Sequence, residues 1–443
     1  MKLFVTEKHH KAFLEATKTI ISYPSILNEG ENGTPFGQAI QDVLEKTLDI
    51  CQKIGFETYI DPKGYYGYAE IGEGSDTLAI LCHLDVVPEG DTKLWDTDPF
   101  EAIEKDGKLY GRGTQDDKGP SMMALYATKA LLDANVRFNK KIRFIFGTDE
   151  ETLWRCMNRY SAAEEKATFG FAPDASFPLT YAEKGLLQAK LHGQGSHDLI
   201  LDMGQAYNVV PAKATYTGEN IDRLAHELDK LSFDYQLNDQ QLTVYGLAQH
   251  AKDAPKGINA IVRLAKALSH IYEHPTLDFL AKVVDEDGCG FNIFGDIKDS
   301  PSGTLSFNAA GLTITPETSE IRLDIRIPVL ADKEELVKKL KSIASDYQLT
   351  YEEYDYLAPL YVPLESEIVN TLLSVYREKT SDMQKAKSSG GATFARTMEN
   401  CVAFGALFPH AEQTEHQENE CIVIEDAFKA MDIYAEAIYR LTR

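Results

Sequence analysis

The chain has few cysteines, fewer basic than acidic residues and no long apolar run. Its six cysteines are scattered over 443 residues without a Cys-x-x-Cys pair, which favours reduced thiols over a disulfide framework. Lys and Arg number 45 against 69 Asp and Glu, giving a formal net charge of −24. This acidic balance argues against nucleic acid or an anionic membrane as partner. No apolar stretch approaches the ~20 residues of a membrane span.

The N-terminus and the length bear on location and domain number. Residues 1–10 carry charge and no apolar segment follows them, so we expect no signal peptide and a cytoplasmic location. A chain of 443 residues is too long for one compact core, and two or three domains are expected.

Three apolar runs, rich in β-branched and aromatic residues, predict buried parallel strands covered on both faces. They lie at residues 77–86, 141–151 and 167–173. Helical periodicity is found at residues 8–22, 34–54, 120–134, 366–380 and 425–441. The alternating β/α order predicts an α/β domain with a mixed or parallel sheet flanked by helices.

After residue 185 the pattern changes. Segments now alternate like half-exposed strands, at residues 186–192, 212–217, 241–247 and 320–328. Such strands, with helices between them, predict a separate α+β unit. Helix and buried-strand patterns return near residue 359, including a short strand at 401–407. We therefore expect a discontinuous domain, 1–185 and 359–443, interrupted by an inserted α+β domain at 186–358.

Side chains that can bind metal gather where the predicted strands end, and functional groups collect at that edge of a doubly wound sheet. The candidates are His83, Glu150, Glu151 and Asp174 at strand ends, Asp116 in the glycine-rich loop 110–119 and His416 in a polar loop. Singly, such residues are more often solvated loop residues, helix caps or satisfied core histidines. Together, three carboxylates and two imidazoles suit two divalent ions if one carboxylate bridges them.

Asp85 lies two residues past His83, on the same side of the strand. We predict that it holds the imidazole in its metal-binding tautomer. The alternative is an ordinary turn residue before Pro88.

Five motifs together resemble the M20 family of dinuclear zinc peptidases, and most closely its peptidase V type of dipeptidase, also called Xaa-His or β-Ala-Xaa dipeptidase. They are His83-Leu-Asp85, Gly111-Arg-Gly-Thr-Gln-Asp-Asp-Lys-Gly119, Asp149-Glu-Glu151, Pro173-Asp174 and His416. The resemblance covers nearly the whole chain. It implies a zinc-peptidase catalytic domain, an inserted lid domain and two Zn²⁺ per chain, with Mn²⁺ or Co²⁺ as alternatives.

The resemblance also implies a role for each residue. Asp116 would bridge both ions, and the Asp116–Asp117 peptide is expected to be cis. The remaining ligands would pair as His83 with Asp174 on one ion and Glu151 with His416 on the other. Glu150 would be the general base on the bridging water.

Further residues resemble the family's substrate-binding groups. Asn208 would contact the substrate, and His250 would stabilise the tetrahedral intermediate, although spacing alone favours an exposed loop histidine. Arg326 would grip the substrate's C-terminal carboxylate in a bidentate pair, although such an arginine is more often a solvated cation. A glycine loop near that carboxylate would contribute Gly390, Gly391 and Thr393, with Ala392 where the family carries another glycine.

The resemblance implies a metal-dependent dipeptidase acting on unblocked dipeptides. The alternative is an N-acyl-amino-acid amidohydrolase such as succinyl-diaminopimelate desuccinylase. Asp174 favours the dipeptidase, because in this family an Asp there accompanies a free amino group and a Glu accompanies N-acylated substrates.

Two other functions are less consistent with the sequence. A catalytically inactive relative would usually have lost Glu150 or a ligand, and an aminopeptidase of longer peptides would need an open cleft. The expected partner is a small dipeptide. We expect a monomer, since the long lid of the peptidase V type replaces the dimer contact, with a homodimer as the alternative.

Overall fold

The computed structural model describes residues 3–204, 206–238 and 240–443. The chain divides into two compact units. Unit 1 contains Met1–Tyr181, Tyr361–Lys387 and Thr393–Arg443, and unit 2 contains Ala182–Leu360 and Ser388–Ala392. Unit 2 thus begins four residues earlier and ends two residues later than the expected inserted domain. It also takes in Ser388–Ala392, which the sequence analysis placed in the catalytic domain.

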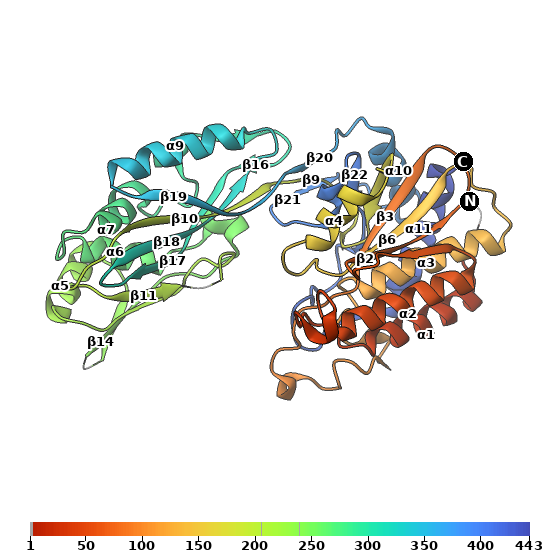
Figure 1. Cartoon of the computed structure of the whole chain (residues 1–443), viewed down its shortest axis with the longest axis horizontal. Coiled ribbons are helices and arrows are strands. Elements are labelled where there is room, and N and C mark those ends of the chain that lie inside the picture. The colour runs from red at the N-terminus through yellow and green to blue at the C-terminus, as the bar shows by residue number, and fades with distance from the viewer. Residues whose placement is uncertain (1–2, 205, 239) are drawn as a thin grey trace. The chain divides into compact units, whose positions relative to one another are not determined.

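Unit 1 is built on a large mixed sheet (Figure 1). Its strands are β1 Glu57–Ile60, β2 Tyr66–Ile71, β3 Thr77–His83, β6 Lys141–Gly147, β7 Phe169–Ala172, β9 Thr180–Glu183, β20 Leu360–Tyr361, β21 Lys387–Ser389 and β22 Cys401–Ala403. They are ordered β1-β2-β6-β3-β7-β22-β9-β20, with β21 paired to β9. Strands β6, β3, β7 and β22 are parallel to one another, whereas β1, β2 and β9 join antiparallel.

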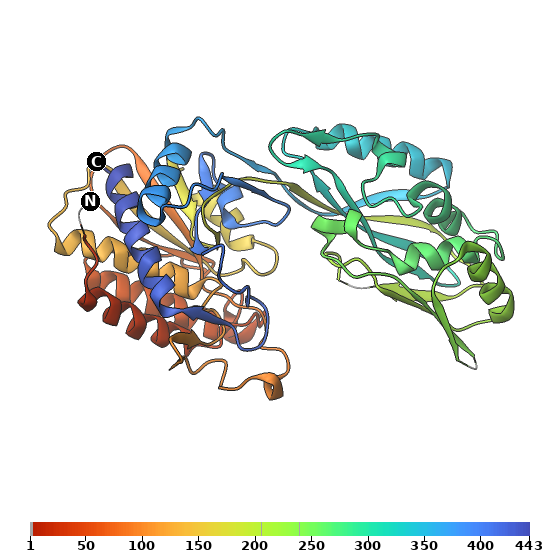
Figure 2. The same ribbon diagram turned by 180° about the vertical axis from the view of Figure 1, so that it is seen from behind.

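Helices cover both faces of this sheet. They are α1 Glu7–Ile21, α2 Gln38–Ile54, α3 Lys118–Asp133, α4 Arg155–Ala163, α10 Glu367–Thr380 and α11 Ile424–Leu441. Tyr66 packs its ring 5.2 Å from Tyr160 of α4, while the next residue, Gly67, lies against Leu48 of α2. Since successive strand residues face opposite sides, α4 and α2 cover opposite faces. Helices α10 and α11, blue in Figure 2, pack against each other.

Two predicted elements of unit 1 differ from the structure. Helix α2 begins at Gln38 rather than at residue 34, because Gly37 precedes it with a φ of 117°, which glycine adopts readily. Residues 401–407 form two strands rather than one, β22 and β23 Ala406–Leu407. The break lies at Gly405, whose φ is 76°, and the two pieces pair with different strands, β7 and β8 Ala175–Ser176. The described helices include none that is long and apolar enough to cross a membrane.

A three-stranded sheet connects two distant segments of unit 1. Its strands are β4 Ile103–Lys105, β5 Lys108–Tyr110 and β24 Cys421–Val423. Strand β5 is central, and Tyr110 at its end is opposite Cys421 at the start of β24. The glycine-rich loop after β5 and the polar loop before β24 therefore extend from the same end of one strand pair.

Unit 2 has an antiparallel sheet of order β11-β17-β18-β10-β19. The strands of this unit are β10 Gly185–Gln194, β11 Leu201–Gly204, β12 Lys213–Tyr216, β13 Tyr235–Asn238, β14 Gln241–Tyr245, β15 Lys298–Asp299, β16 Gly303–Thr304, β17 Ser306–Ile314, β18 Thr318–Ile327 and β19 Thr350–Leu357. Its helices are α5 Ile221–Leu231, α6 Ala260–Leu268, α7 Pro275–Phe279, α8 Phe291–Phe294 and α9 Lys333–Asp346. Alternate residues of β10 are buried in one apolar core with the helices, as an α+β unit requires.

Candidate metal centre

The ends of three neighbouring parallel strands in unit 1 deliver the predicted ligands. His83 is the last residue of β3 and is directly opposite Gly147, the last residue of β6. Glu150 and Glu151 follow β6 after a short turn, and Asp174 follows β7. Because β6, β3 and β7 are adjacent and parallel, these side chains share one edge of the sheet.

Asp116 lies at the centre of the cluster. Its Oδ1 is 2.8 Å from Nε2 of His83, and its Oδ2 is 3.0 Å from Nε2 of His416. Nε2 of His416 is also 3.1 Å from Oε1 of Glu151, and Oδ2 of Asp174 is 3.8 Å from Nε2 of His83. Two ligands of one tetrahedral ion lie ~3.3 Å apart, since each bond is about 2.0–2.2 Å long. These separations therefore fit N/O ligation of divalent cations.

The electrostatics of the cluster also fit a cation. Hydrogen bonds with Asp116 and Glu151 raise the pKa of His416 to about 11. Burial raises the pKa of Asp174 well above its usual range, and the neighbouring Asp116 charge adds to this shift. Burial and Asp116 likewise raise the pKa of Glu151. Protons on these groups stand in for the positive charge that a metal ion brings.

The glycine-rich loop turns sharply before α3. The Asp116–Asp117 peptide is cis, as the family resemblance implied. The next turn brings the backbone of Gly119 against Thr114, where a Cβ atom would lie only 2.0 Å from the Thr114 carbonyl oxygen. Only glycine fits there. The carboxylate of Asp117 accepts hydrogen bonds from the His83 backbone N–H and the Ser121 hydroxyl, which joins the loop to β3 and α3.

Asp85 holds His83 in a different way from the one predicted. Its backbone oxygen, not its carboxylate, lies 3.0 Å from Nδ1 of His83, and the nearest carboxylate oxygen is 3.7 Å away. The carboxylate instead accepts a hydrogen bond from the Glu151 backbone N–H at 3.0 Å. The main-chain contact directs Nε2 of His83 toward Asp116, and the side chain positions the turn that carries Glu151.

Glu420 and Arg112 were missed in the sequence, where Glu420 is one of several acidic residues in a polar loop. Both are buried, and Nη1 of Arg112 donates to Oε2 of Glu420 at 2.8 Å. The Glu420 carboxylate also accepts hydrogen bonds from backbone N–H groups of the glycine-rich loop. An arginine inside a glycine-rich loop was the available signal.

Asn208 and His250 come together in unit 2. The backbone oxygen of Asn208 accepts a hydrogen bond from Ala251, which begins the short helix η3 Ala251–Lys256. Nδ1 of His250 accepts from the Lys252 backbone N–H at 3.1 Å, so the neutral ring carries its proton on Nε2. Partial desolvation, Arg326 and Lys252 lower the pKa of His250 to about 4. The ring still reaches solvent and is neutral at neutral pH.

Arg326 is already paired in unit 2. Its Nε and Nη2 donate to the Asp324 carboxylate at 2.6 and 3.0 Å, and its Nη1 donates to the Gly390 carbonyl at 2.9 Å. A guanidinium has five N–H donors, so one on each terminal nitrogen is left beyond these contacts. Arg326 and Gly390 of the glycine loop are thus in direct contact.

The other two residues of the glycine loop have local roles in the structure. Gly391 donates its backbone N–H to the Ser389 hydroxyl at 2.9 Å. Thr393 belongs to unit 1, where its hydroxyl caps the short helix η5 Phe394–Thr397. The loop therefore crosses the boundary between the two units.

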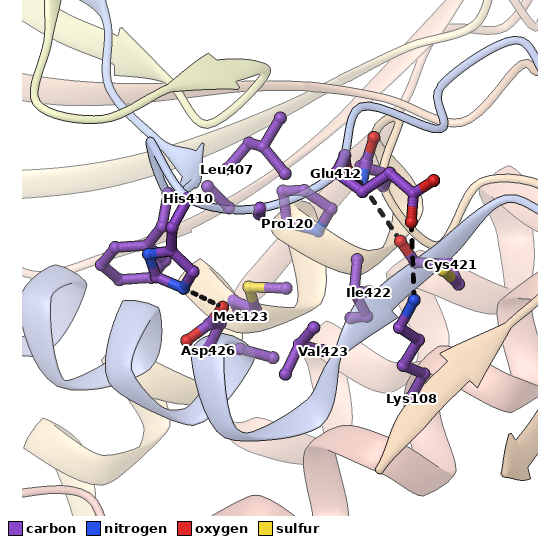
Figure 3. Close-up of a pocket in the computed structure, with 15 residues that line it drawn as sticks. Lys108, Pro120, Met123, Leu407, His410, Glu412, Cys421, Ile422, Val423 and Asp426 are labelled. Atoms are coloured by element: carbon purple, nitrogen blue, oxygen red, sulfur yellow. Dashed lines mark hydrogen bonds and ion pairs between the residues drawn. The ribbon is translucent and has the colours of Figure 1, made fainter. Parts of the chain in front are cut away.

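A cavity of about 270 Å³ in unit 1 is separate from the predicted ligands. Apolar side chains such as Met123, Leu407 and Ile422 line it, and it is flanked by the Lys108–Glu412 ion pair and by the hydrogen bond between His410 and Asp426 (Figure 3). None of the five predicted ligands is among its lining residues.

A family model described as peptidase family M20/M25/M40 matches residues 79–440. The chain belongs to this family. The "Putative dipeptidase YtjP" of Bacillus subtilis is 35% identical to this M20 peptidase over 452 residues, covering 96% of each chain. The resemblance to the M20 family seen in the sequence is thereby confirmed.

Two solved structures share the fold of this M20 peptidase. Human carnosine dipeptidase 1 has a TM-score of 0.60 at 16% identity and covers 98% of each chain. The di-peptidase Dug1p from Saccharomyces cerevisiae has a TM-score of 0.61 at 14% identity, covering 98% of this chain and 97% of its own. The predicted fold class, an α/β catalytic unit with an inserted lid domain, is confirmed. The protein is a metal-dependent hydrolase.

Proposed function

We propose that this M20 peptidase is a dipeptidase of the peptidase V type that hydrolyses unblocked dipeptides with two metal ions. The observation that carries this proposal is the Asp116 carboxylate, whose two oxygens face two different histidines at 2.8 and 3.0 Å. A carboxylate placed in this way can bridge two ions, with Asp174 and Glu151 as further ligands. The dipeptidase name of the Bacillus subtilis relative supports the substrate class.

The five ligands would hold Zn²⁺, and Mn²⁺ or Co²⁺ suit the same imidazole and carboxylate donors. When bound, such ions would acidify a water molecule and polarise the scissile carbonyl. Glu150 would take the proton of that water and pass it to the leaving amine. Burial raises the pKa of Glu150 well above its usual range, which suits a group that accepts and then releases a proton.

Unit 2 would supply the groups that recognise the substrate. The Nε2–H of neutral His250 would donate a hydrogen bond to the oxyanion. Arg326 would bind the C-terminal carboxylate with its two remaining N–H groups, beside Gly390. Asn208, Gly391 and Thr393 would complete the binding site.

The competing proposal is hydrolysis of N-acyl amino acids at the same centre. Asp174 favours dipeptides, because the family resemblance associates an Asp at this position with substrates that carry a free amino group. The shorter carboxylate changes only local charge and geometry, so the substrate test below decides between the two.

A substrate comparison on the metal-loaded protein tests the proposal. β-Ala-His and Leu-Leu would be assayed against N-acetyl and N-succinyl amino acids, with amine release as the readout and a chelated sample as control. We expect cleavage of free dipeptides only, lost on chelation and restored by Zn²⁺ or Mn²⁺. Cleavage of acylated substrates only would replace the dipeptidase by the amidohydrolase.

We also propose that the protein acts as a monomer in the cytoplasm. Its six cysteines are all unpaired and five are buried, which suits a reducing compartment. Light scattering on the purified protein would give 49.4 kDa for a monomer. A value twice as large would mean a homodimer.

A further inference from the structure

Two loops that carry metal ligands hold each other through their side chains. The aspartate loop, residues 111–116, follows β5 and ends in Asp116, and the histidine loop, residues 412–420, contains His416 and precedes β24. Both extend from the point where Tyr110 pairs with Cys421. Beyond that point each loop has irregular backbone, so the distance between the two ligands depends on contacts other than strand pairing.

Among the described residues, the hydrogen-bond partners of the Gln115 side chain, next to Asp116, are backbone groups of the histidine loop and of the first residue of β24. Its Oε1 accepts hydrogen bonds from the N–H groups of Thr414 and Glu415 at 2.8 and 3.0 Å. Its Nε2 donates to the carbonyls of Glu412 and Cys421 at 3.1 and 3.0 Å. These four bonds use the whole hydrogen-bonding capacity of the amide. Gln115 therefore fixes the backbone immediately before His416.

The Glu420 carboxylate, four residues after His416, makes the reciprocal contacts. Its Oε1 accepts from the backbone N–H groups of Gly113, Gln115 and Asp116 at 3.1, 2.8 and 3.2 Å. Its Oε2 accepts from Arg112 at 2.8 Å. Glu420 is fully buried, and several N–H donors on one carboxylate make a strong, directional contact. It fixes the backbone that carries Asp116.

The backbone of His416 needs such support. Its φ is 62°, in the left-handed region that residues other than glycine seldom adopt. Such a conformation persists when surrounding contacts determine it. The hydrogen bonds of Gln115 to the two preceding residues supply contacts of this kind.

We propose that Gln115 and Glu420 form a reciprocal clasp that sets the Asp116–His416 separation and thereby the affinity of the ion bound by His416. Neither side chain is a predicted ligand, so both are positioning residues. This inference rests on the proposed two-ion function. The ion at His83 and Asp174 shares only the bridging Asp116 with the clasp and is otherwise held at the ends of β3 and β7, so we expect the clasp to affect it less.

Metal titrations of the full chain test the clasp without an activity readout. The metal-free protein would be titrated with Zn²⁺ against a chromophoric chelator, and with Co²⁺ while its absorption spectrum is recorded. The variants are Gln115→Ala and the isosteric Glu420→Gln. His416→Ala identifies the binding step that belongs to His416. Gln417→Ala is the matched control, because Gln417 lies in the same loop and its side chain makes one exposed hydrogen bond.

In both clasp variants we expect the step lost in His416→Ala to weaken by about 10–100-fold, as for other residues that orient ligands. The Co²⁺ spectrum of that step should change, and the other step, which shares only Asp116, should weaken clearly less. Unchanged steps, or two steps weakened equally, would overturn the clasp. If Glu420→Gln does not fold, Gln115→Ala decides alone.

The wild-type titration separates this inference from the proposed function. A wild-type chain that binds only one ion contradicts the two-ion function. The clasp is then judged by whether that single ion depends on Gln115 as it depends on His416. The wild type and the clasp variants could each bind two ions with the same affinities. That result would overturn the clasp and leave the two-ion function standing.

Discussion

The two units neutralise their functional charges in different ways. Among the described residues, the ion pairs of Asp116, Glu151 and Asp174 in unit 1 are all formed with His83 or His416. In unit 2, the buried Arg326 has a full carboxylate partner in Asp324 two residues away on the same strand. Bound cations would therefore balance the predicted ligands of unit 1, whereas Arg326 of unit 2 is balanced by its own neighbour.

This difference indicates which unit a bound cation would stabilise. A cation that binds the folded carboxylates stabilises the fold by mass action, about 2.7 kcal/mol at a free concentration of 100 Kd. That stabilisation should reach the loops of unit 1 and not the sheet of unit 2.

Metal removal should give the largest effect. We expect chelation to abolish turnover, because it removes the groups that activate water and polarise the carbonyl. Amide hydrogen exchange should accelerate in the aspartate and histidine loops and at residues 148–154, while β10 and β18 keep their protection. The magnesium complex of the chelator serves as control. Equal acceleration in both units would refute the contrast between them.

Glu150→Gln should give the next largest effect. The amide keeps the shape of the side chain but cannot take a proton, so kcat should fall about 10²–10⁴-fold. Metal stoichiometry should remain that of wild type, since Glu150 is not a predicted ligand. Glu165→Gln, an exposed residue of unit 1, is the control. Activity retained in Glu150→Gln would exclude its role as general base.

The sequence predicted the elements that carry an uninterrupted local signal. The apolar run predicted at residues 141–151 forms β6 over Lys141–Gly147, and the helical pattern predicted at 8–22 forms α1 over Glu7–Ile21. The convergence of His83 and Asp174 followed from the rule that parallel strands end at one edge. Such features depend on periodicity and strand order, and both can be inferred from sequence.

Features that depend on distance could not be predicted in this way. Strand β17 is buried at all but one residue and contains Asn308 and Gly311 without alternation, because the helices α6 and η3 also pack against it. Asp85 contacts the His83 ring through its backbone oxygen. A contact of the main chain cannot be predicted from the pattern of side chains. Glu420 reaches the aspartate loop from about 300 residues away in sequence, and spacing contains no information about that contact.

His250→Ala tests the contribution of unit 2 to catalysis. Loss of one oxyanion donor typically lowers kcat about 10²–10³-fold, and metal binding should be unchanged. Because the pKa of His250 is lowered to about 4, the ring stays neutral from pH 5 to 8, and the size of the defect should be constant over that range. His270→Ala, an exposed histidine paired with Glu227 in the same unit, is the control. If His250→Ala also weakened metal binding, this would contradict the assignment of metal binding to unit 1 and of oxyanion stabilisation to His250.

Arg326→Lys should give the smallest effect and the most specific one. Lysine keeps the positive charge near the buried Asp324 but lacks the planar fork that binds a carboxylate in two places. A hydrogen bond to a charged group contributes about 1.5–3 kcal/mol, so KM for dipeptides should rise about 10–100-fold with a smaller change in kcat. Dipeptide amides, which lack the carboxylate, are the matched control substrates. Their KM should rise much less. An equal rise in KM for free dipeptides and for their amides would mean that Arg326 does not bind the substrate. It would then support the fold of unit 2 through Asp324 and Gly390.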